Sequence, residues 1–536
     1  MDAPLEVSKD IALCIENTAS DHFNNREVPT DLTLWQATKR WPKVTLYCLA
    51  LTSGVLLWGY DAAMAGNLAA LDQFKYDYGV LHGKKWIIPS KWLGGWNATG
   101  PLGTMLGAII SGACLDRYGR RINLAAGSLT TAVGVAIIWV SQYASREARP
   151  GVFMLGKIVM GTSLGVVVTT TQTYISEVLP SVLRGPIIAF FPLFYLFGQL
   201  ISAIVAFAAE KKEGPAAYRL CLISMWPFAA LPLLCAAMMP ESPVYLIRRM
   251  MLGRAFQAQK RLDTNKDDTQ ANVNQTRAWI IHEQEAAQSD RSRYVDCFRG
   301  TDKRRTLIVI FATIIPQLFG LPILGDGPYF LQVTGMNSRN SLIYLMTGIA
   351  GGIVSTIISM WLLTRFGRRP LSLVTPTILS FLWLGMGVAG CFEAEPVPWF
   401  VGATLNTAVA VAALGVWPAS YVVASETSSL RLRAKTQGIG WACHSVANLV
   451  FSLIPPFIYN TDAGNLRAKI GFVWAAIAGL GTVLFYFIVP EMLHRTPLQL
   501  DLMFEQKTPT RMFCAWQGHG IEQAIVAEVD GKQDRE

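Results

Sequence analysis

The feature of this chain that most restricts its fold is a series of long apolar segments. We identify twelve, and in order they are residues 44–66, 94–114, 122–144, 151–172, 186–208, 217–239, 306–334, 340–363, 370–391, 398–421, 436–459 and 468–489. A helix of about 20 apolar residues is long enough to cross a bilayer core of about 30 Å. Only 15% of the residues are charged, compared with about 25% in a soluble domain. The sequence therefore predicts an all-α membrane protein with twelve transmembrane helices.

Polar segments divide the predicted helices into two sets of six. Residues 240–304 are rich in Lys, Arg, Asp and Gln, and predict a solvated, partly helical cytosolic linker. This linker separates a first six-helix half, residues 44–239, from a second, residues 305–490. Residues 1–43 and 491–536 are predicted to form the two tails.

Basic residues in the short turns predict the orientation in the membrane. The turns after the second, sixth, eighth and tenth segments read DRYGRR, IRRMMLGR, TRFGRR and LRLRAK, whereas EKKEG and CFEAEP follow the fifth and ninth. The positive-inside rule therefore predicts that both tails are cytosolic, and we expect a plasma-membrane location. The start of the chain lacks the pattern of a cleaved signal peptide. These basic turns account for the net charge of +9, so the charge does not indicate a nucleic-acid partner.

The sequence contains no motif that indicates catalysis or cofactor binding. The nine cysteines have no spacing typical of a disulfide framework or a metal site. The sequence contains no GxxxxGK[ST] phosphate-binding loop, so it does not indicate a pump that is driven by ATP. No grouping of a nucleophile with a base stands out. We therefore expect no cofactor, no metal and no enzymatic activity.

The two halves repeat each other. The segment RYGRR, which ends at Arg121, returns as RFGRR, which ends at Arg369, an offset of 369 − 121 = 248 residues. Glu177 in SEVLPSVLR and Glu426 in SETSSLRLR differ by 426 − 177 = 249, and each has an arginine seven residues later. Parallel six-helix repeats are typical of transporters that bind a solute near the middle of the membrane, between the halves.

The repeated basic turns predict a cytosolic gate. Gly112 and Asp116 lie four residues apart on one helical face, so we expect the glycine to admit a neighbouring helix and the carboxylate to face that helix's positive N-terminus. The arginines of the first turn are expected to pair with Glu177 and Glu426 when this gate is closed. The alternative is that the arginines only orient the protein in the membrane. The predicted gating residues are Gly112, Asp116, Arg117, Arg120, Arg121, Glu177, Arg184, Arg368, Arg369, Glu426 and Arg433.

These motifs resemble those of the sugar porter family of the major facilitator superfamily, over nearly all of residues 44–504. PESPVYL (240–246) and PEMLHRTPLQLDLMF (490–504) correspond to further signature positions of that family. The segments YDYGVLHGKKWIIPSKW and PPFIYNTDAGNLRAKIGFVW are similar to fungal maltose and α-glucoside permeases. The resemblance implies the major facilitator fold. Thr364 stands where sugar porters usually have Asp, so the two repeated gates are expected to be unequal.

Two ionisable residues within the apolar segments are the predicted proton-coupling site. Asp61 lies well inside the first segment and Lys157 inside the fourth, and charged side chains at such depth usually serve a function. The resemblance implies a protonation site at Asp61, in the position where proton-coupled sugar porters have an acid. Lys157 is expected to pair with Asp61. The alternative is a static ion pair that fixes helix packing.

Glycines and prolines interrupt the seventh segment and predict a broken helix that exposes backbone groups to the solute. By resemblance, Pro192, Pro316 and Pro322 replace side chains that bind sugar hydroxyls in sugar porters. Proline offers no side-chain donor or acceptor, which weakens the case for a simple hexose. The predicted substrate-binding residues are Gln199, Gln317, Asp326, Tyr329, Trp417, Tyr421, His444 and Asn448. His444 has the alternative of a hydrogen-bonded packing residue.

The sequence thus predicts a proton-coupled secondary active transporter of the sugar porter type. Its expected partners are a sugar-like or α-glucoside-like small organic solute, protons and the lipid bilayer. One alternative is a transporter or exporter of a fungal secondary metabolite, which the three prolines and Asp326 favour. Another is a nutrient sensor that does not transport. Such sensors usually carry long cytosolic tails, whereas the tail after Phe504 is short.

Overall fold

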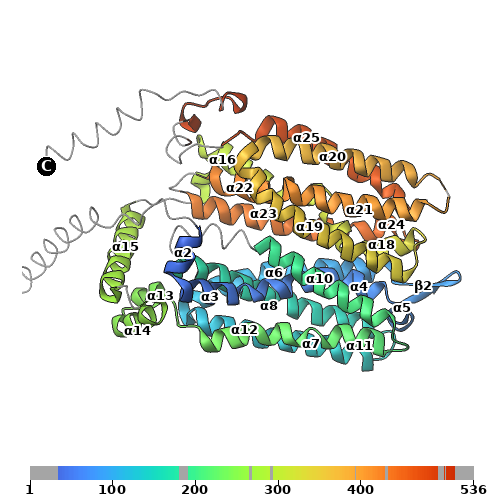
Figure 1. Cartoon of the computed structure of the whole chain (residues 1–536), viewed down its shortest axis with the longest axis horizontal. Coiled ribbons are helices and arrows are strands. Elements are labelled where there is room, and N and C mark those ends of the chain that lie inside the picture. Colours follow the sequence, from blue (N-terminus) through green and yellow to red (C-terminus); the bar gives the residue numbers. More distant parts are fainter. Residues whose placement is uncertain are drawn as a thin grey trace, which may run out of the picture.

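The computed structural model of the chain contains twelve helices that are long and apolar enough to cross a membrane, within the described residues. This confirms the predicted number. The described residues are 34–179, 191–264, 268–289, 294–392, 394–428, 432–492, 500 and 503–513. Figure 1 shows two bundles that lie side by side with their helices roughly parallel, one from the first half of the chain and one from the second.

The helices of the first half are long, and several are interrupted. The first span is divided at Thr52 into α3 and α4, and the sixth is divided near Ser224 into α11 and α12. The elements are α2 Leu34–Arg40, α3 Pro42–Leu51, α4 Ser53–Ala69, α5 Asp72–Tyr78, α6 Ser90–Tyr118, α7 Arg120–Val140, η1 Ser141–Tyr143, α8 Arg149–Val178, α10 Phe191–Glu210, α11 Ala216–Ile223 and α12 Trp226–Met238.

A β-hairpin between α5 and α6 was not expected from the sequence. Its strands are β1 Val80–His82 and β2 Lys85–Ile87, paired antiparallel with His82 opposite Lys85. Gly83 is the first of the two residues that connect the strands. It has φ +63°, and a two-residue hairpin turn needs such a positive φ at this position, which glycine adopts readily. The hairpin lies at one end of the bundle in Figure 1, which we call the hairpin end.

The linker between the halves is more ordered than predicted. It contains α13 Pro243–Arg248, α14 Leu252–Leu262, α15 Thr269–Ser289 and η2 Tyr294–Phe298. One face of these helices buries a small core of its own, which includes Leu246, Ala258 and Val273. In Figure 1, α13 to α15 lie at the end of the bundle opposite the hairpin, which we call the basic end.

The second half contains the broken seventh helix that the sequence predicts. Gly320 has φ +89°, a left-handed conformation that glycine adopts at no steric cost, and it ends the first piece of this helix. The elements are α16 Asp302–Leu318, α17 Leu321–Gly325, α18 Gly327–Val333, α19 Ser338–Phe366, α20 Arg368–Ala389, α21 Val397–Leu414, α22 Val416–Thr427, α23 Arg433–Leu453, α24 Pro455–Tyr459, η3 Arg467–Lys469, α25 Ile470–Ile488 and η4 Thr510–Met512.

Close helix packing in the first half depends on Gly103 and Gly107 of α6. A Cβ on Gly107 would lie 1.9 Å from the backbone oxygen of Thr162 in α8, and one on Gly103 would lie 2.6 Å from the Thr162 nitrogen. The prediction for Gly112 was wrong, because this glycine is exposed and a Cβ there would meet no atom within 4 Å. Gly103 and Gly107 lie one helical turn apart, and they allow α6 to approach α8 closely. This contact lies nearer the middle of α6 than the sequence predicts.

Candidate functional site

Each basic turn binds a glutamate that follows the last membrane helix of the same half. In the first half, the Glu241 carboxylate accepts hydrogen bonds from the backbone nitrogens of Arg120, at 2.9 Å, and Arg121, at 3.2 Å. These are the first residues of α7, where unpaired backbone N–H groups and the helix dipole attract an anion. Gly119, with φ +91°, has no Cβ that would collide with this carboxylate.

The second half repeats this arrangement. The Glu491 carboxylate accepts from the backbone nitrogens of Arg368, at 3.3 Å, and Arg369, at 2.9 Å, at the start of α20. Gly367, with φ +87°, occupies the place of Gly119. Glu241 and Glu491 differ by 491 − 241 = 250 residues, which agrees with the repeat offset found in the sequence. That offset was the signal by which both glutamates could have been predicted as functional.

The arginine–glutamate pairs at the basic end form within each half. Arg120 donates through two nitrogens to Glu177, with 2.9 Å between Nε and Oε2. Arg368 donates through Nη2 to Oε1 of Glu426 at 2.8 Å. The expectation that first-half arginines pair with Glu426 is therefore not met in this conformation. The second pair is the weaker one, because the Arg368 Nε and the Glu426 Oε2 have no partner among the described residues.

Other predicted gating residues lie outside these contacts. The Asp116 side chain is exposed and forms no hydrogen bond or ion pair with any described residue. It is therefore not the anion at the start of α7, because Glu241 already occupies that place. Arg117 lies over the Tyr118 ring, and Arg121 donates to the Ala236 oxygen at 2.7 Å.

For three further positions in the predicted gates, the side chain lies outside the described residues. Arg184 lies outside the described residues. Arg433 begins α23 and Thr364 lies in α19, but the side chains of both are outside the described set.

Asp61 and Lys157 meet inside the first half. The Lys157 ammonium donates to the Asp61 carboxylate, and its nitrogen also lies 3.3 Å from the Asp61 backbone oxygen. The side chains are 4% and 3% exposed, so the pair is removed from solvent. Gly100 of α6 packs beside the Asp61 carboxylate, where an added Cβ would lie 3.7 Å from Oδ2. Two opposite charges thus satisfy each other within three packed helices, α4, α6 and α8.

Asp326 occupies the junction between α17 and α18 and is buried. Its Oδ2 accepts a hydrogen bond from the Asn97 amide of α6, in the other half, and lies 3.4 Å from the Tyr459 hydroxyl of α24. It was predicted to bind a donor or cation on the solute. In this conformation its partners are protein side chains.

Tyr329 contacts the other half at the hairpin end. Its hydroxyl lies 3.3 Å from the backbone oxygen of Ile88 and 3.2 Å from Oδ1 of Asn460. Asn460 in turn donates to the Ile88 oxygen at 2.8 Å. Tyr329 was predicted to contact the solute, but in this conformation its hydroxyl is hydrogen-bonded to the segment between the hairpin and α6.

More hydrogen bonds join the halves at the same end. The Ser90 backbone nitrogen donates to the Asp462 carboxylate at 2.8 Å, and Lys75 donates to Gln332 at 2.8 Å. Gln332 also donates to the Ala70 oxygen. Among the described residues, all hydrogen bonds between residues 44–239 and 305–490 use first-half residues from 70 to 97. The hairpin end is therefore closed.

An aromatic cluster also bridges the two halves. Tyr195 of α10 lies edge-on to Trp417 of α22, with ring centroids 6.0 Å apart, and Tyr421 stacks on Trp441 at 5.7 Å. Gln199 lies one turn beyond Tyr195 on the same helix. Flat, apolar ring faces with few polar groups suit an organic solute with an extended apolar face.

The remaining predicted binding residues line up on α16 and α23. His444 Nδ1 lies 2.8 Å from the Thr313 backbone oxygen, so the histidine has the packing contact that was its alternative. One turn further along these helices, Gln317 is buried with its Oε1 unpaired among the described residues. Asn448 accepts from Ser452 at 3.2 Å. Gln317 thus keeps a buried acceptor that has no partner among the described residues.

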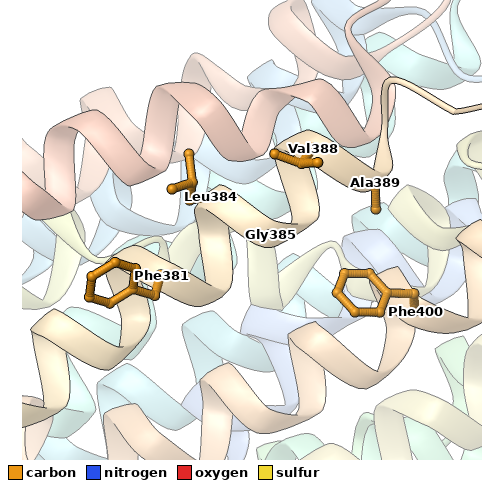
Figure 2. Close-up of a pocket in the computed structure, with 6 residues that line it drawn as sticks. All are labelled: Phe381, Leu384, Gly385, Val388, Ala389 and Phe400. Carbon is orange, nitrogen blue, oxygen red and sulfur yellow. The ribbon is translucent and has the colours of Figure 1, made fainter.

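A groove on the outer surface of the second half has a different character. Figure 2 shows its lining, which consists of Phe381, Leu384, Gly385, Val388, Ala389 and Phe400 on α20 and α21. Phe381 and Phe400 are 69% and 50% exposed. These residues offer no side-chain donor or acceptor, so the groove suits lipid chains and lacks the groups that orient a polar solute.

The fold and repeat geometry agree with the comparison to known families. A family model described as Sugar (and other) transporter matches residues 46–504. The chain belongs to this family. Among curated relatives of this sugar transporter family member, MFS transporter fmqE of Aspergillus fumigatus is 27% identical over 95% of the chain and 96% of its own length. The general alpha-glucoside permease of Saccharomyces cerevisiae is 26% identical over 93% of the chain and 82% of its own length.

Solved structures share the fold. The inward open conformation of the xylose transporter XylE from E. coli has a TM-score of 0.70 and 20% identity, over 86% of this chain and 99% of that one. The proton:xylose symporter XylE bound to 6-bromo-6-deoxy-D-glucose has a TM-score of 0.66 and 20% identity, over 87% and 100%. This confirms the major facilitator fold, with twelve membrane helices in two halves, for a multi-pass membrane protein.

Proposed function

We propose that this sugar transporter family member is a secondary active transporter that couples proton movement to the transport of a small organic solute. The observation that carries the proposal is the Asp61–Lys157 ion pair. A pair of charges buried in the apolar interior of a membrane protein costs free energy, and such groups usually take part in ion or proton movement. A carboxylate paired with an ammonium can exchange its partner for a proton, which gives the site two charge states.

The proposed orientation places the basic end in the cytosol, since it carries the arginine-rich turns. We place the protein in the plasma membrane. With the hairpin end closed by hydrogen bonds, we propose that this conformation is closed to the outside of the cell. In the opposite conformation, the two halves are proposed to approach each other at the basic end. The Arg120–Glu177 and Arg368–Glu426 pairs are proposed to stabilise that closed state.

The proposed solute is sugar-like or glucoside-like but larger than a hexose, or less hydroxylated. Relatives that are named for α-glucosides support the sugar-like part of the proposal. Trp417 and Tyr421 are the proposed stacking surfaces, and Gln317, Gln199 and Asn448 the proposed polar contacts. Pro192, Pro316 and Pro322 favour a second candidate, a carrier or exporter of a fungal secondary metabolite, because they remove side-chain partners for sugar hydroxyls.

Transport by the purified protein in liposomes tests the proposal. Maltose, an aryl glucoside, glucose and planar secondary metabolites are first ranked by thermal shift, and the solutes that stabilise the protein are then tested for uptake. An imposed pH gradient is expected to drive accumulation above equilibrium, and a protonophore is expected to abolish it. Uptake that only equilibrates, whatever the gradient, would contradict proton coupling. Stabilisation by glucose alone would contradict the proposed solute class.

A further inference from the structure

Asp326 is a second buried carboxyl group, separate from the Asp61–Lys157 pair. It is 4% exposed and lies where the broken seventh helix of the second half meets the first half. Its Oδ2 accepts from the Asn97 amide across the interface between the halves, and the Tyr459 hydroxyl lies 3.4 Å away on its own half. Separation of the halves at this point necessarily breaks the Asn97 hydrogen bond.

The backbone around Asp326 is pressed against the first half. A Cβ on Gly66 of α4 would lie 2.7 Å from the Gly325 oxygen and 2.8 Å from the Asp326 Cα. No layer of solvent fits between α4 and the junction of α17 and α18. The Asp326 carboxyl is therefore shielded from water as long as the hairpin end is closed, and it becomes hydrated when that end opens.

The surroundings of Asp326 do not supply a cation of its own. The titratable and polar groups that act on it, directly or through Tyr459, are Asn97, Lys157, Tyr329, Tyr459 and Asp462. Lys157 is the cation among them, and its ammonium is held by Asp61. Asp326 takes part in no ion pair among the described residues. An ionised carboxylate that is buried with hydrogen bonds but no counter-charge costs several kcal/mol, whereas the neutral acid does not.

We propose that Asp326 is a second proton-binding site, in the second half, that binds its proton as the hairpin end closes and releases it as that end opens. The proton comes from the solution on the hairpin side, the carboxylate becomes a carboxylic acid, and the reverse occurs on opening. Acid therefore favours the closed hairpin end and alkali the open one. The inference rests on the proposed alternation between two conformations, and it adds a proton site that belongs to the gate.

Distance measurements between two spin labels test this directly. Tyr143 at the end of the first half's η1 and Asn337 before α19 are exposed and lie at the hairpin end of opposite halves. Tyr143→Cys and Asn337→Cys carry the labels in nanodiscs, in a chain in which Cys14, Cys114, Cys391, Cys443 and Cys514 are replaced by serine. Between about pH 5.5 and about pH 8.5, the ratio of long to short distances is expected to rise by about tenfold or more, as a single linked proton allows.

Asp326→Asn, which keeps the shape of the neutral acid, is expected to hold the short distance at both pH values. Asn97→Ala removes the bond across the interface and is expected to raise the long-distance population at low pH. If Asp326→Asn did not fold, the wild-type and Asn97→Ala measurements would still decide. A pH-independent wild type, or an Asp326→Asn protein with the wild-type response, overturns the proposal.

The assay requires neither a solute nor a gradient, so its failure is separate from failure of the proposed function. If transport proves to be proton-coupled but the distances do not respond to pH, only the Asp326 proposal falls. If the distances respond through Asp326 but no solute is accumulated, the proton site stands and the proposed coupling of transport falls.

Discussion

At the scale of single residues, the buried pair of Asp61 and Lys157 limits what the first half can do. Each charge makes the burial of the other tolerable, and removal of one partner leaves an uncompensated charge in an apolar environment. A proton that neutralises Asp61 would release Lys157, and the released ammonium would then seek another partner. Within the first half, the proposed coupling chemistry therefore involves these two side chains.

Asp61→Asn fixes this position in a neutral state. We expect the variant to lose accumulation driven by a pH gradient but to keep exchange of solute, because the proposed solute contacts lie elsewhere. Uptake and counterflow into proteoliposomes measure the two activities. Glu147→Gln is the matched control, since that carboxylate is exposed in the loop before α8 and the change is expected to behave as wild type. Normal pH-driven accumulation by Asp61→Asn would refute the assignment.

At the scale of elements, the repeated turns show what a sequence can and cannot reveal. The twelve spans, the repeat and the broken seventh helix were predictable, because each depends on a local pattern of apolar residues, glycine or proline. The Asp61–Lys157 contact was also predictable, because isolated charges in apolar segments need partners. The repeat offset between Glu241 and Glu491 marks both glutamates in the sequence, but the contact of Glu241 with α7 joins residues about 120 positions apart, so its partner was missed.

The start of α7 provides a test of this correction. Glu241→Ala leaves two backbone N–H groups of α7 without their acceptor, and we expect a loss of about 1 to 2 kcal/mol in the free energy of unfolding. Asp116→Ala should change stability by less than about 0.5 kcal/mol, because its side chain is exposed and unpaired among the described residues. Thermal unfolding in detergent compares the two. Equal effects would restore Asp116 as the anion of this turn.

The packing of α6 on α8 offers a second test at this scale. Gly107→Ala places a methyl group where the Thr162 backbone oxygen now lies, so the helices must separate, at a cost of about 1 to 3 kcal/mol. Gly112→Ala adds the same methyl group in open space on the same helix, and we expect it to be neutral. The order of the two thermal midpoints is the measurement. A destabilising Gly112→Ala with a neutral Gly107→Ala would mean that α6 packs through its other end.

At the scale of the whole molecule, the two halves are similar in sequence but not equivalent in their contacts. Hydrogen bonds join them at the hairpin end, whereas the arginine–glutamate pairs of the basic end are satisfied within each half. Such an arrangement permits the basic end to open without the loss of either of these two pairs. Opening of the hairpin end, in contrast, requires new partners for Ser90, Asn460 and Asp326. The two ends of the molecule therefore differ in the contacts that opening would break, and the proposed solute path lies between them.

The choice of solute is a property of that whole path, and here we predict a departure from hexose transport. A site that recognises hydroxyl groups needs donors and acceptors placed to meet them, and the proline at position 322 supplies neither through its side chain. In a yeast strain without its own hexose carriers, the correctly localised protein should therefore support poor growth on glucose. Pro322 lies in the first turn of α17, where another residue is tolerated, so Pro322→Asn restores a donor and an acceptor at little structural cost. That variant should take up glucose faster than its parent. Saturable, high-affinity glucose uptake by the parent would show that backbone groups or water replace the missing side chains, and the proposed solute class would have to be abandoned.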